Sequence, residues 1–422
     1  MTELEKSLFV ADLPSARTIL RNINWNFYHK SAFSPHELRP FNTRTYHWYP
    51  ATFIPEIPYT LIEVLTLPNA TVWDPFSGIG TTYFQALSLN RNALATEICG
   101  VAVEYMRSLF TLFNPRIDFK KAEIEVEKIL GEFNTTKNYT SLFQGFALIN
   151  RLEPWFSEKT LNQLSFLFGK EASCENKELK SIFRICISAL LKSVCSQNRG
   201  WGCVADNVLP KEDQIEDKKV LALFKNNARR LLKEISEHLK NTRPGYSALY
   251  EDMSKKQTIF HEDVRLSNGI SDRSVDLVVS SPPYPNMTDY VTSQRLSYYF
   301  LGFDLVEKRN VADACLEIGA RSRRSRKDSL EKYLEDMRKA NGVISRKIKE
   351  EGYVCYVLPA FSMDNENNKN RRQIVQKVLA DMAEHDLIKE DEYERILPAI
   401  RRSHNAKWAT LEREKIYLFR RV

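Results

Sequence analysis

Two short segments of this chain carry residue types that could take part in chemistry. The first is Ser281-Pro282-Pro283-Tyr284, which directly follows an apolar run at positions 275–280. Its prolines stiffen the loop and donate no N–H bonds, so the Ser281 hydroxyl and the Pro282 carbonyl can accept from both N–H groups of an amine. Tyr284 supplies a ring face on which a planar base can stack. The loop therefore favours the binding of an aromatic amine, whose delocalised lone pair must be oriented before it can react.

The second segment runs from Asp74 to Thr82 and reads Asp-Pro-Phe-Ser-Gly-Ile-Gly-Thr-Thr. Gly78 and Gly80 lack Cβ atoms, so the backbone can turn sharply and approach a ligand closely. A helix beginning near Thr81 would point free N–H groups at the same place. Asp74, at the end of a predicted strand, could accept from an ammonium group. A glycine turn that binds nothing, or that binds NAD, is the alternative interpretation of the glycines alone.

Two further acids follow predicted strands. Glu97 ends the strand predicted at 93–96, where the acidic residue of dinucleotide-type folds takes ribose hydroxyls. Asp263 follows the strand predicted at 258–260 and could accept a hydrogen bond from an adenine amino group. The alternative for Asp263 is a surface acid that caps a turn.

The elements that must position these residues alternate between strand and helix. Strands are predicted at 71–73, 93–96, 258–260, 275–281 and 352–358, with an antiparallel pair at 395–400 and 416–419. Helices are predicted at 59–67, 81–89, 292–300, 330–349 and 374–385. This alternation of strands and helices implies a parallel, doubly wound α/β sheet with right-handed crossovers.

A helical insertion separates the second strand from the third. Apolar residues recur at helical spacing at 124–133, 161–168, 179–194 and 220–239. Residues 1–45 show no clean period and are interpreted as an irregular arm packed on the catalytic domain. We therefore expect the arm and the first part of the catalytic domain at 1–110, the insertion at 111–255, and the second catalytic part at 256–422.

Composition limits the class of protein. With 422 residues and 43% hydrophobic content, disorder is not the expected state. A net charge of +7 permits a polyanionic partner without requiring one. The seven cysteines form no CxxC pair, so neither a disulfide framework nor a metal site is expected. No apolar run is long enough to cross a membrane, and we expect a soluble, cytoplasmic protein.

Together, the two segments resemble the DNA amino-methyltransferases, the cytosine-N4 and adenine-N6 enzymes of restriction–modification systems. The resemblance covers residues 46–110 and 255–422. It implies a Rossmann-like, doubly wound, seven-stranded methyltransferase sheet, with the helical insertion as the candidate target recognition domain. It also implies S-adenosylmethionine as cofactor and double-stranded DNA as substrate, with a cognate restriction endonuclease as a candidate partner.

The resemblance carries over onto particular residues. The base pocket falls on Ser281, Pro282, Pro283 and Tyr284, and the loop from Tyr49 to Phe53 resembles an additional cofactor-binding segment of some branches. The candidate cofactor-binding residues are Tyr49, Pro50, Asp74, Phe76, Gly78, Gly80, Thr81, Thr82, Glu97 and Asp263. No covalent nucleophile is needed, and the Pro-Cys pair of ring-carbon cytosine methylases does not occur.

Basic residues supply candidate DNA contacts. Residues 321–327 hold five cations in seven positions, which could neutralise phosphates beside an extruded base; a solvated helix start is the alternative. Residues 193–210 contain amides, an arginine and aromatic residues suited to reading base edges, or else form a packed loop. The candidate DNA-binding residues are Arg199, Arg321, Arg323, Arg324 and Arg326.

Serine ahead of Pro-Pro-Tyr is commoner in cytosine-N4 enzymes, whereas adenine-N6 enzymes usually carry Asp or Asn. The sequence therefore favours cytosine-N4, with adenine-N6 as the alternative. An RNA guanine-N2 methyltransferase, which usually carries Asp at this position, and a catalytically silent DNA-binding module are the other hypotheses. One departure is that many members with Ser-Pro-Pro-Tyr place that loop before the glycine turn, whereas here the glycine turn comes first. This order is compatible with other branches of the family, but it weakens any transfer of a target sequence.

Overall fold

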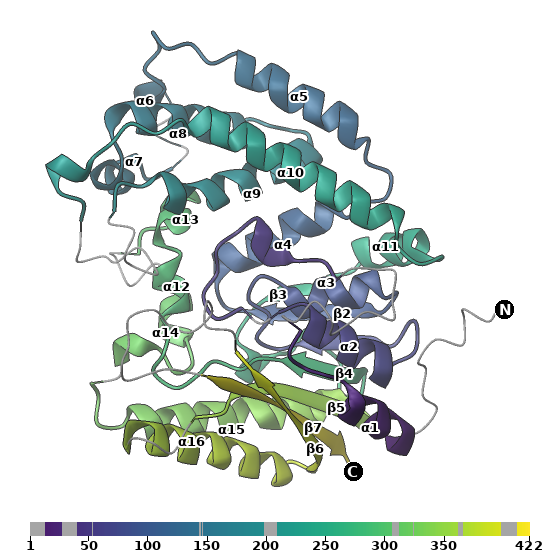
Figure 1. The fold of residues 1–422 in the computed structure, drawn as a ribbon. Coiled ribbons are helices and arrows are strands. Elements are labelled where there is room, and N and C mark those ends of the chain that lie inside the picture. Colours follow the sequence, from purple (N-terminus) through teal and green to yellow (C-terminus); the bar gives the residue numbers. More distant parts are fainter. Residues whose placement is uncertain are drawn as a thin grey trace.

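A central sheet between two helical layers forms the framework of the protein (Figure 1). The computed structural model describes residues 13–27, 40–52, 54–142, 145, 147–197, 209–305, 312–323, 325–361, 366–397 and 412–422. The strands are β1 Thr71–Asp74, β2 Asn92–Glu97, β3 Ile259–His261, β4 Val275–Ser280, β5 Ile348–Pro359, β6 Leu387–Ile396 and β7 Arg413–Arg421. Their order in the sheet is β3-β2-β1-β4-β5-β7-β6.

The order of the strands fixes where a ligand can bind. Strands β3, β2, β1, β4 and β5 are parallel, and β7 runs antiparallel between β5 and β6. The chain builds outward from β1 to β3 and then returns to add β4 on the other side of β1. Open α/β sheets bind ligands at such a switch point, outside the carboxyl ends of the strands. The predicted Rossmann-like, doubly wound sheet of seven strands is confirmed.

The predicted position of the edge strand was wrong. The sequence placed it at 395–400, whereas β6 spans Leu387–Ile396 and residues 398–400 lie outside the described part of the chain. Along β6 only three positions, including Leu387 and Tyr393, are buried, and charged residues fill most of the others. An edge strand of this kind shows almost no apolar run, so the sequence pattern was weak.

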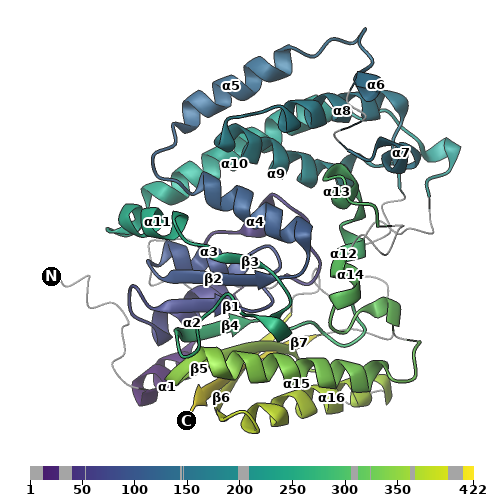
Figure 2. The same cartoon turned by 180° about the vertical axis from the view of Figure 1, so that it is seen from behind.

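The two faces of the sheet carry separate cores. Val72, Leu277 and Val279 pack into the core that contains α2 Glu56–Leu65, α3 Thr81–Ser88 and α4 Gly100–Leu112. Trp73 and Val278, which point the opposite way, pack into the core beneath α15 Ser329–Lys347 and α16 Glu366–Ala383. Figure 2 shows α15 and α16 lying together on this second side. Alternate residues of each strand are therefore buried on opposite faces.

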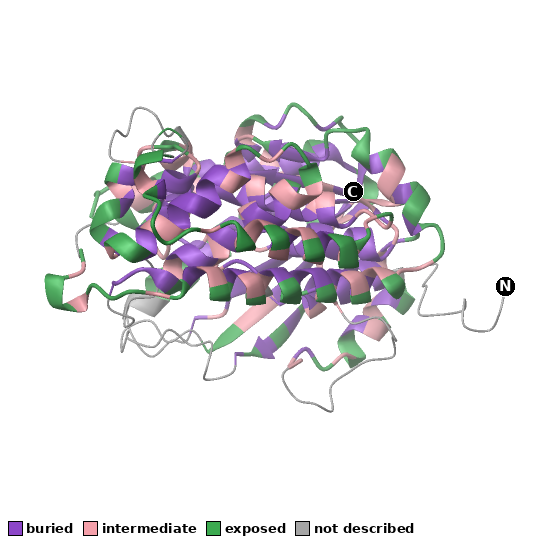
Figure 3. Ribbon diagram, turned by 90° about the horizontal axis from the view of Figure 1, so that it is seen from above, coloured by how far each residue is buried: buried purple, intermediate pink, exposed green. Residues whose placement is uncertain are grey.

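The helical insertion packs on the first of these layers. Its long helices α5 Phe119–Gly131, α8 Glu158–Ala172, α9 Lys177–Val194 and α10 Val220–Lys240 confirm the helical spacing found in the sequence. Its shorter helices are α6 Tyr139–Leu142, α7 Ile149–Leu152 and α11 Tyr246–Ser254. The insertion shares one continuous core with α2, α3 and α4, and exposed residues gather on the outer faces of its helices (Figure 3).

Polar contacts also join the insertion to the sheet layer. His238 of α10 hydrogen-bonds Ser88 of α3, with 2.7 Å between Nε2 and Oγ. Arg243 pairs with the buried Glu63 of α2 at 2.7 Å. The insertion therefore rests directly on the helices that cover β1 and β2.

Three short helices connect the carboxyl edge of the sheet with the insertion. They are α12 Tyr290–Ser293, α13 Arg295–Phe300 and α14 Ala312–Leu316. Figures 1 and 2 both show them as a column between the insertion and α15. The helix predicted at 292–300 is split at Gln294, whose buried side-chain amide donates to the Trp48 carbonyl at 3.2 Å. Among the described helices, none is both long enough and apolar enough to cross a bilayer.

The interpretation of residues 1–45 as an irregular arm was wrong for residues 13–22. They form the helix α1, Leu13–Asn22, because Ala16 and Leu20 fall on one face and are buried. The helix docks against β6, where Trp25 stacks on Tyr393 at a centroid distance of 5.4 Å. A helix this short gave too few repeats of its apolar period to be recognised in the sequence.

The α1 contact can be tested by substitution. We expect Trp25→Ala to lower the free energy of unfolding by about 3 kcal/mol, since burial of a large aromatic ring is lost and a cavity remains. The indole N–H bond to the Leu20 carbonyl is lost as well. Urea unfolding measures the change, and Asn22→Ala on the exposed face of α1 should stay within about 0.5 kcal/mol of the wild type. Equal effects of the two substitutions would contradict the docking of α1.

Candidate active site

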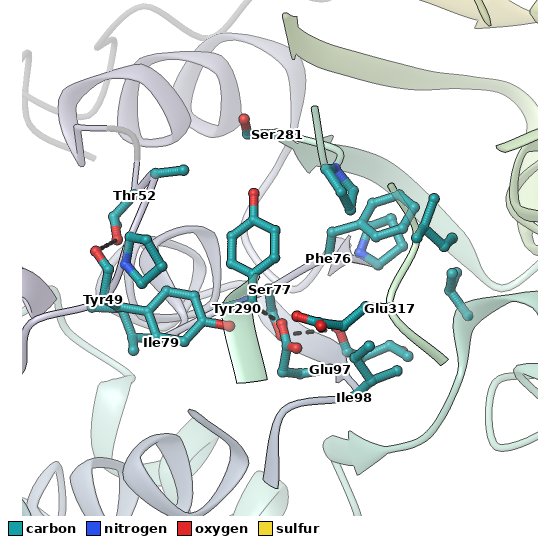
Figure 4. A pocket seen from close by; sticks show the side chains of 18 of the residues that line it. Tyr49, Thr52, Phe76, Ser77, Ile79, Glu97, Ile98, Ser281, Tyr290 and Glu317 are labelled. Atoms are coloured by element: carbon teal, nitrogen blue, oxygen red, sulfur yellow. Dashed lines mark hydrogen bonds between the residues drawn. The ribbon is translucent and has the colours of Figure 1, made fainter. Parts of the chain in front are cut away.

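The glycine turn and the Ser-Pro-Pro-Tyr loop open onto the same pocket. It lies at the carboxyl ends of β1, β2, β3 and β4, and both Gly78 and Ser281 line it. The pocket holds about 760 Å³ of empty space, part of it open to solvent, which is within the range of small-molecule sites. In the close view of Figure 4, Ser281 and Glu97 stand on opposite sides of this space.

The glycine turn is shaped by packing within the protein. Gly78 and Gly80 both have positive φ, at 51° and 82°, a backbone region that favours glycine. A Cβ atom at Gly78 would lie 3.1 Å from the Tyr49 ring, and one at Gly80 would lie 2.9 Å from Met106 Sδ. The missing Cβ atoms therefore make room for Tyr49 and Met106. They allow the turn to close before α3 begins at Thr81.

Glu97 lies in the pocket and is bound to the glycine turn. The Gly78 N–H donates to Glu97 Oε2 at 2.7 Å, and the Cys99 N–H donates to Oε1 at 2.8 Å. Burial raises the pKa of Glu97 to about 7, although these two N–H groups favour the ionised form. Near neutral pH, Glu97 is therefore part ionised and part neutral, and a charged ligand shifts the balance between the two forms.

Asp74 lies behind the turn and does not line the pocket. Its Oδ1 accepts from the Ser280 hydroxyl at 2.5 Å and from the Phe76 N–H at 3.1 Å. Burial raises the pKa of Asp74 to about 6. Next to it, the Thr82 hydroxyl donates to the Val279 carbonyl at 3.0 Å. These bonds join the end of β1 and the start of α3 to β4.

Asp263 lines the pocket, but its carboxylate is already engaged. It caps the short turn Val264–Leu266 by accepting from the Arg265 N–H at 2.9 Å. The Arg265 guanidinium also binds it, with 2.6 Å between Nη2 and Oδ2, and reaches the Leu316 carbonyl at 2.9 Å. The turn-capping alternative raised from the sequence is thus present in the structure. A contact of Asp263 with adenine stays a prediction.

The ten predicted cofactor residues divide into two groups. Those that line the pocket are Tyr49, Pro50, Phe76, Gly78, Thr81, Glu97 and Asp263. Those that lie behind it are Asp74, Gly80 and Thr82, which are buried in the described structure. Phe53, the last residue of the predicted loop after Tyr49, lies outside the described residues.

The Ser-Pro-Pro-Tyr loop presents only part of its motif to the pocket. Ser281 and Pro283 line it, whereas Pro282 and Tyr284 are buried. The Pro283 carbonyl accepts from the Tyr333 hydroxyl of α15 at 3.0 Å, which fixes the course of the loop. The Tyr284 ring belongs to the core beneath α15.

A segment that the sequence analysis did not select completes the wall. We call residues 313–320, which precede the basic cluster, the bridging segment; three of its residues, Leu316, Glu317 and Ile318, line the pocket. The Glu317 carboxylate accepts from the Val291 N–H at 2.9 Å, and the Gly319 carbonyl accepts from the Asn286 N–H at 2.9 Å. The segment carries no recognisable motif, because tertiary contacts alone bring it to the site.

The bridging segment also contacts the side of the pocket on which the glycine turn lies. Asp313 Oδ2 accepts from the Tyr298 hydroxyl at 2.8 Å and from the Gly100 N–H at 3.0 Å. Its Oδ1 lies 3.3 Å from His261 Nε2, at the end of β3. The hydrogen bond with Asp313 raises the pKa of His261. The bridging segment therefore contacts two parts of the site. On one side it meets the end of β3 and the start of α4, and on the other it meets the loop that follows Ser281.

The charge of the pocket indicates what it can bind. Its charged lining residues are all acidic: Glu97, Glu262, Asp263 and Glu317. None of the described lining residues is a lysine, arginine or histidine. Apolar side chains such as Phe76, Ile98 and Ile318 supply the remaining walls. A nucleoside with a positive charge fits this lining, whereas the phosphates of NAD would meet repulsion.

Part of the predicted DNA-binding cluster lies near the pocket. Arg321 is exposed, and its N–H donates to the Thr288 carbonyl at 3.3 Å, in the loop that follows Ser281. Arg326 is also exposed. Arg323 ends the short turn Arg321–Arg323. Arg199 and Arg324 lie outside the described residues.

Comparison with solved structures gives low overall similarity. The rRNA methyltransferase aviRa from Streptomyces viridochromogenes has a TM-score of 0.33 and 9% identity, with 89% of this chain and 88% of that chain covered. A SAM-dependent methyltransferase from Methanosarcina mazei has a TM-score of 0.22 and 7% identity, with 43% and 79% covered.

Sequence comparison gives more specific matches. The N6/N4 family described as "DNA methylase" matches residues 17–107. The Type II methyltransferase M.BsoBI of Geobacillus stearothermophilus is 24% identical over 299 residues, covering 65% of this chain and 56% of that protein. The Type II methyltransferase M.MvaI of Kocuria varians is 24% identical over 251 residues, covering 57% and 53%. The chain thus spans about half the length of the curated relatives that it matches. The family match includes the glycine turn, and in sequence the chain is similar to DNA methylases of the N6/N4 type.

Proposed function

We propose that this protein is an S-adenosylmethionine-dependent DNA methyltransferase that methylates the exocyclic N4 amine of a cytosine extruded from a specific duplex sequence. The observation that carries the proposal is the shared pocket of Gly78 and Ser281. A cofactor turn and an amine-binding loop must face one another for a methyl group to pass between them. The similarity to the N6/N4 DNA methylase family and to a Type II methyltransferase supports the same chemistry.

The lining of the pocket suits the cofactor. S-adenosylmethionine supplies an electrophilic methyl group on a positively charged sulfur. Tyr49, Pro50, Phe76, Gly78 and Glu97 would hold it, together with Thr81 at the start of α3. The acidic lining favours its charge, and the Glu97 carboxylate retains lone pairs that can accept from ribose hydroxyls in addition to its two backbone bonds.

The loop at Ser281 acts on the amine. The Ser281 hydroxyl and the Pro282 carbonyl accept from the two N–H groups, which turns the nitrogen lone pair toward the glycine side of the pocket. Because Pro282 and Tyr284 are buried and Tyr333 holds the Pro283 carbonyl, the acceptors are fixed before the base arrives. Fixed placement and exclusion of water then lower the barrier without a covalent nucleophile.

The serine ahead of Pro-Pro-Tyr favours cytosine, and adenine-N6 is the alternative because its amine can make the same two bonds. The helical insertion at 111–255 is the candidate target recognition domain. A restriction endonuclease that cuts the same sequence is the partner against which such an enzyme would protect DNA, and both would act in the cytoplasm.

Identification of the modified nucleoside tests the function. We expect the wild type to transfer methyl groups to duplex DNA and to produce N4-methylcytosine, measured by mass spectrometry after digestion to nucleosides. Ser281→Ala should reduce transfer at least about a hundredfold while it leaves cofactor affinity nearly unchanged, since an acceptor in the reacting geometry is lost. Ser254→Ala, an exposed serine of α11, is the matched control. N6-methyladenine would identify the alternative base, and transfer to RNA alone would contradict the proposal.

Cofactor affinity should depend on pH. The raised pKa values of Glu97 and Asp74, about 7 and about 6, mean that both are partly neutral in mildly acidic solution. A cationic ligand favours their ionised forms, so affinity should rise with pH by up to roughly tenfold per unit for each linked carboxyl group. Calorimetry between about pH 5.5 and 7.5 stays below the titration of the ligand's amino group.

S-adenosylhomocysteine provides the control because it lacks the sulfonium charge. Its affinity should rise less steeply over the same pH range, since only hydrogen bonding then distinguishes the two states of Glu97. Identical slopes for the two ligands would show that the acidic lining does not sense the sulfonium.

The exposed arginines should contribute to DNA affinity. The double substitution Arg321→Gln, Arg326→Gln should weaken duplex binding at every sequence and lower the salt slope by roughly one unit for each arginine that contacts a phosphate. Fluorescence anisotropy over a series of salt concentrations measures this slope. Lys120→Gln, an exposed cation on the remote helix α5, is the control. A salt slope equal to that of the wild type would show that neither arginine contacts a DNA phosphate.

A further inference from the structure

The carboxylate of Asp313 joins three elements that are far apart in the sequence. It accepts from the Tyr298 hydroxyl of α13 at 2.8 Å and from the N–H of Gly100, the first residue of α4, at 3.0 Å. Its other oxygen, Oδ1, lies 3.3 Å from Nε2 of His261, the last residue of β3. The bridging segment is therefore attached at its first residue to the end of β3 and the start of α4.

One short bend, residues 98–100, binds both Asp313 and the pocket carboxylate Glu97. The Cys99 N–H donates to Glu97 at 2.8 Å, and the next N–H, that of Gly100, donates to Asp313. An added Cβ atom at Gly100 would lie 3.2 Å from Asp313 Oδ2, so the missing side chain makes room for this contact. The position of Glu97 and that of the bridging segment thus depend on the same bend.

His261 adds a titratable charge to this attachment. Its side chain is 42% exposed, and its Nε2 lies 3.0 Å from the Ile98 carbonyl as well as close to Asp313. The hydrogen bond with Asp313 raises the pKa of His261, although burial opposes the rise. Burial also opposes the charge of Asp313, but its hydrogen bonds, that with His261 foremost, lower the pKa of Asp313. Asp313 is therefore ionised at neutral pH, and His261 gains its positive charge as the pH falls through its raised pKa.

Three other groups that face the pair keep the same charge near neutral pH. Burial raises the pKa of the Cys99 thiol and of the Tyr298 hydroxyl, both of which lie beside Asp313, so both stay neutral. Arg107 of α4 stays positively charged and opposes the protonation of His261 only in part. The attraction between His261 and Asp313 is therefore strongest below the raised pKa of His261, and it weakens as the pH rises through that value.

We propose that Asp313 is a positioning residue that attaches the bridging segment over the bound cofactor, and that the charge of His261 sets the strength of this attachment. The inference rests on the proposed function and assigns a role to residues that belong to neither of the two motifs. Three residues of the bridging segment line the pocket, among them Glu317 (Figure 4). While Asp313 is bound to the bend, this wall stays in place and slows the release of the cofactor. Loss of the attachment should therefore change the dissociation rate of the cofactor and not its association rate.

The rate of cofactor release tests the attachment. Radiolabelled S-adenosylmethionine is bound to the full chain, and its loss is followed after addition of excess unlabelled cofactor. Asp313→Ala should release it at least about tenfold faster, with association within about threefold of the wild type, since the hydrogen bonds to the strand ends are lost. Gly100→Ala should act in the same direction, because the added Cβ atom displaces the Asp313 carboxylate. Asp252→Ala, which removes an exposed carboxylate of α11 outside the pocket lining, should release the cofactor at the wild-type rate.

The dependence of release on pH separates this attachment from a role in folding alone. His261→Gln keeps an N–H donor but carries no charge, so near pH 6 it should release the cofactor about two- to fivefold faster than the wild type, the range of a partly exposed ion pair. This ratio of rates should fall toward one as the pH rises to about 8.5, where His261 of the wild type loses its charge. Glu97 and the amino group of the ligand titrate in the same range, but they are common to both proteins. In the background of Asp313→Asn, which removes the charge and keeps an acceptor oxygen, His261→Gln should have no further effect.

The outcomes distinguish this inference from the proposed function. Release from Asp313→Ala at the wild-type rate, or a ratio for His261→Gln that does not change with pH, would overturn the inference while the wild type still binds the cofactor. Slower association in Asp313→Ala would also overturn it, because the residue would then only maintain the fold. If Asp313→Ala does not fold, the comparison of His261→Gln in the wild type and in Asp313→Asn decides the matter. A wild type that binds no S-adenosylmethionine would overturn the proposed function, and this inference with it.

Discussion

A buried hydrogen bond between two strand ends controls the geometry of the site. Ser280 at the end of β4 donates to Asp74 at the end of β1, with 2.5 Å between the oxygens. The glycine turn begins directly after Asp74, and the Ser-Pro-Pro-Tyr loop begins directly after Ser280. A second bond, from Thr82 to the Val279 carbonyl, joins the first turn of α3 to the same strand. The two loops therefore leave the sheet from a common, fixed point.

This placement follows from the order of the strands. Because β1 and β4 are parallel neighbours, their carboxyl ends lie side by side although the whole helical insertion separates them in the chain. The bridging segment then closes the pocket from above the strand ends, with Asp313 on the cofactor side and Glu317 on the side of the Ser281 loop. The pocket is thus assembled from strand ends and one crossing segment, and its acidic lining comes from both.

The sequence predicted the parts of this arrangement that depend on local chemistry. The apolar run before Ser281, the two glycines and the helical spacing of the insertion correspond to β4, to the turn with its positive φ angles and to helices α5, α8, α9 and α10. Contacts between residues that are far apart in the sequence could not be predicted in this way. Nothing local distinguishes Tyr290 or Glu317 from other polar surface residues, and only the fold brings them to the pocket. The sequence likewise did not show that the Tyr284 ring packs in the same core as Tyr333 and Met337, and its contact with a base stays a prediction.

The contact between α1 and β6 bears on how the chain reaches this state. Arg17 and Trp25 contact Glu390 and Tyr393, so α1 must wait for a strand that follows it in the chain by more than 350 residues, 373 in the case of Arg17 and Glu390. Contacts of such wide sequence separation form slowly, because the loop between them must close before any favourable interaction is gained. Until then the apolar side of α1 and the first strands of the sheet stay uncovered on the ribosome. Such exposed apolar surface and unpaired strand edges make a folding intermediate prone to aggregation until β6 is in place.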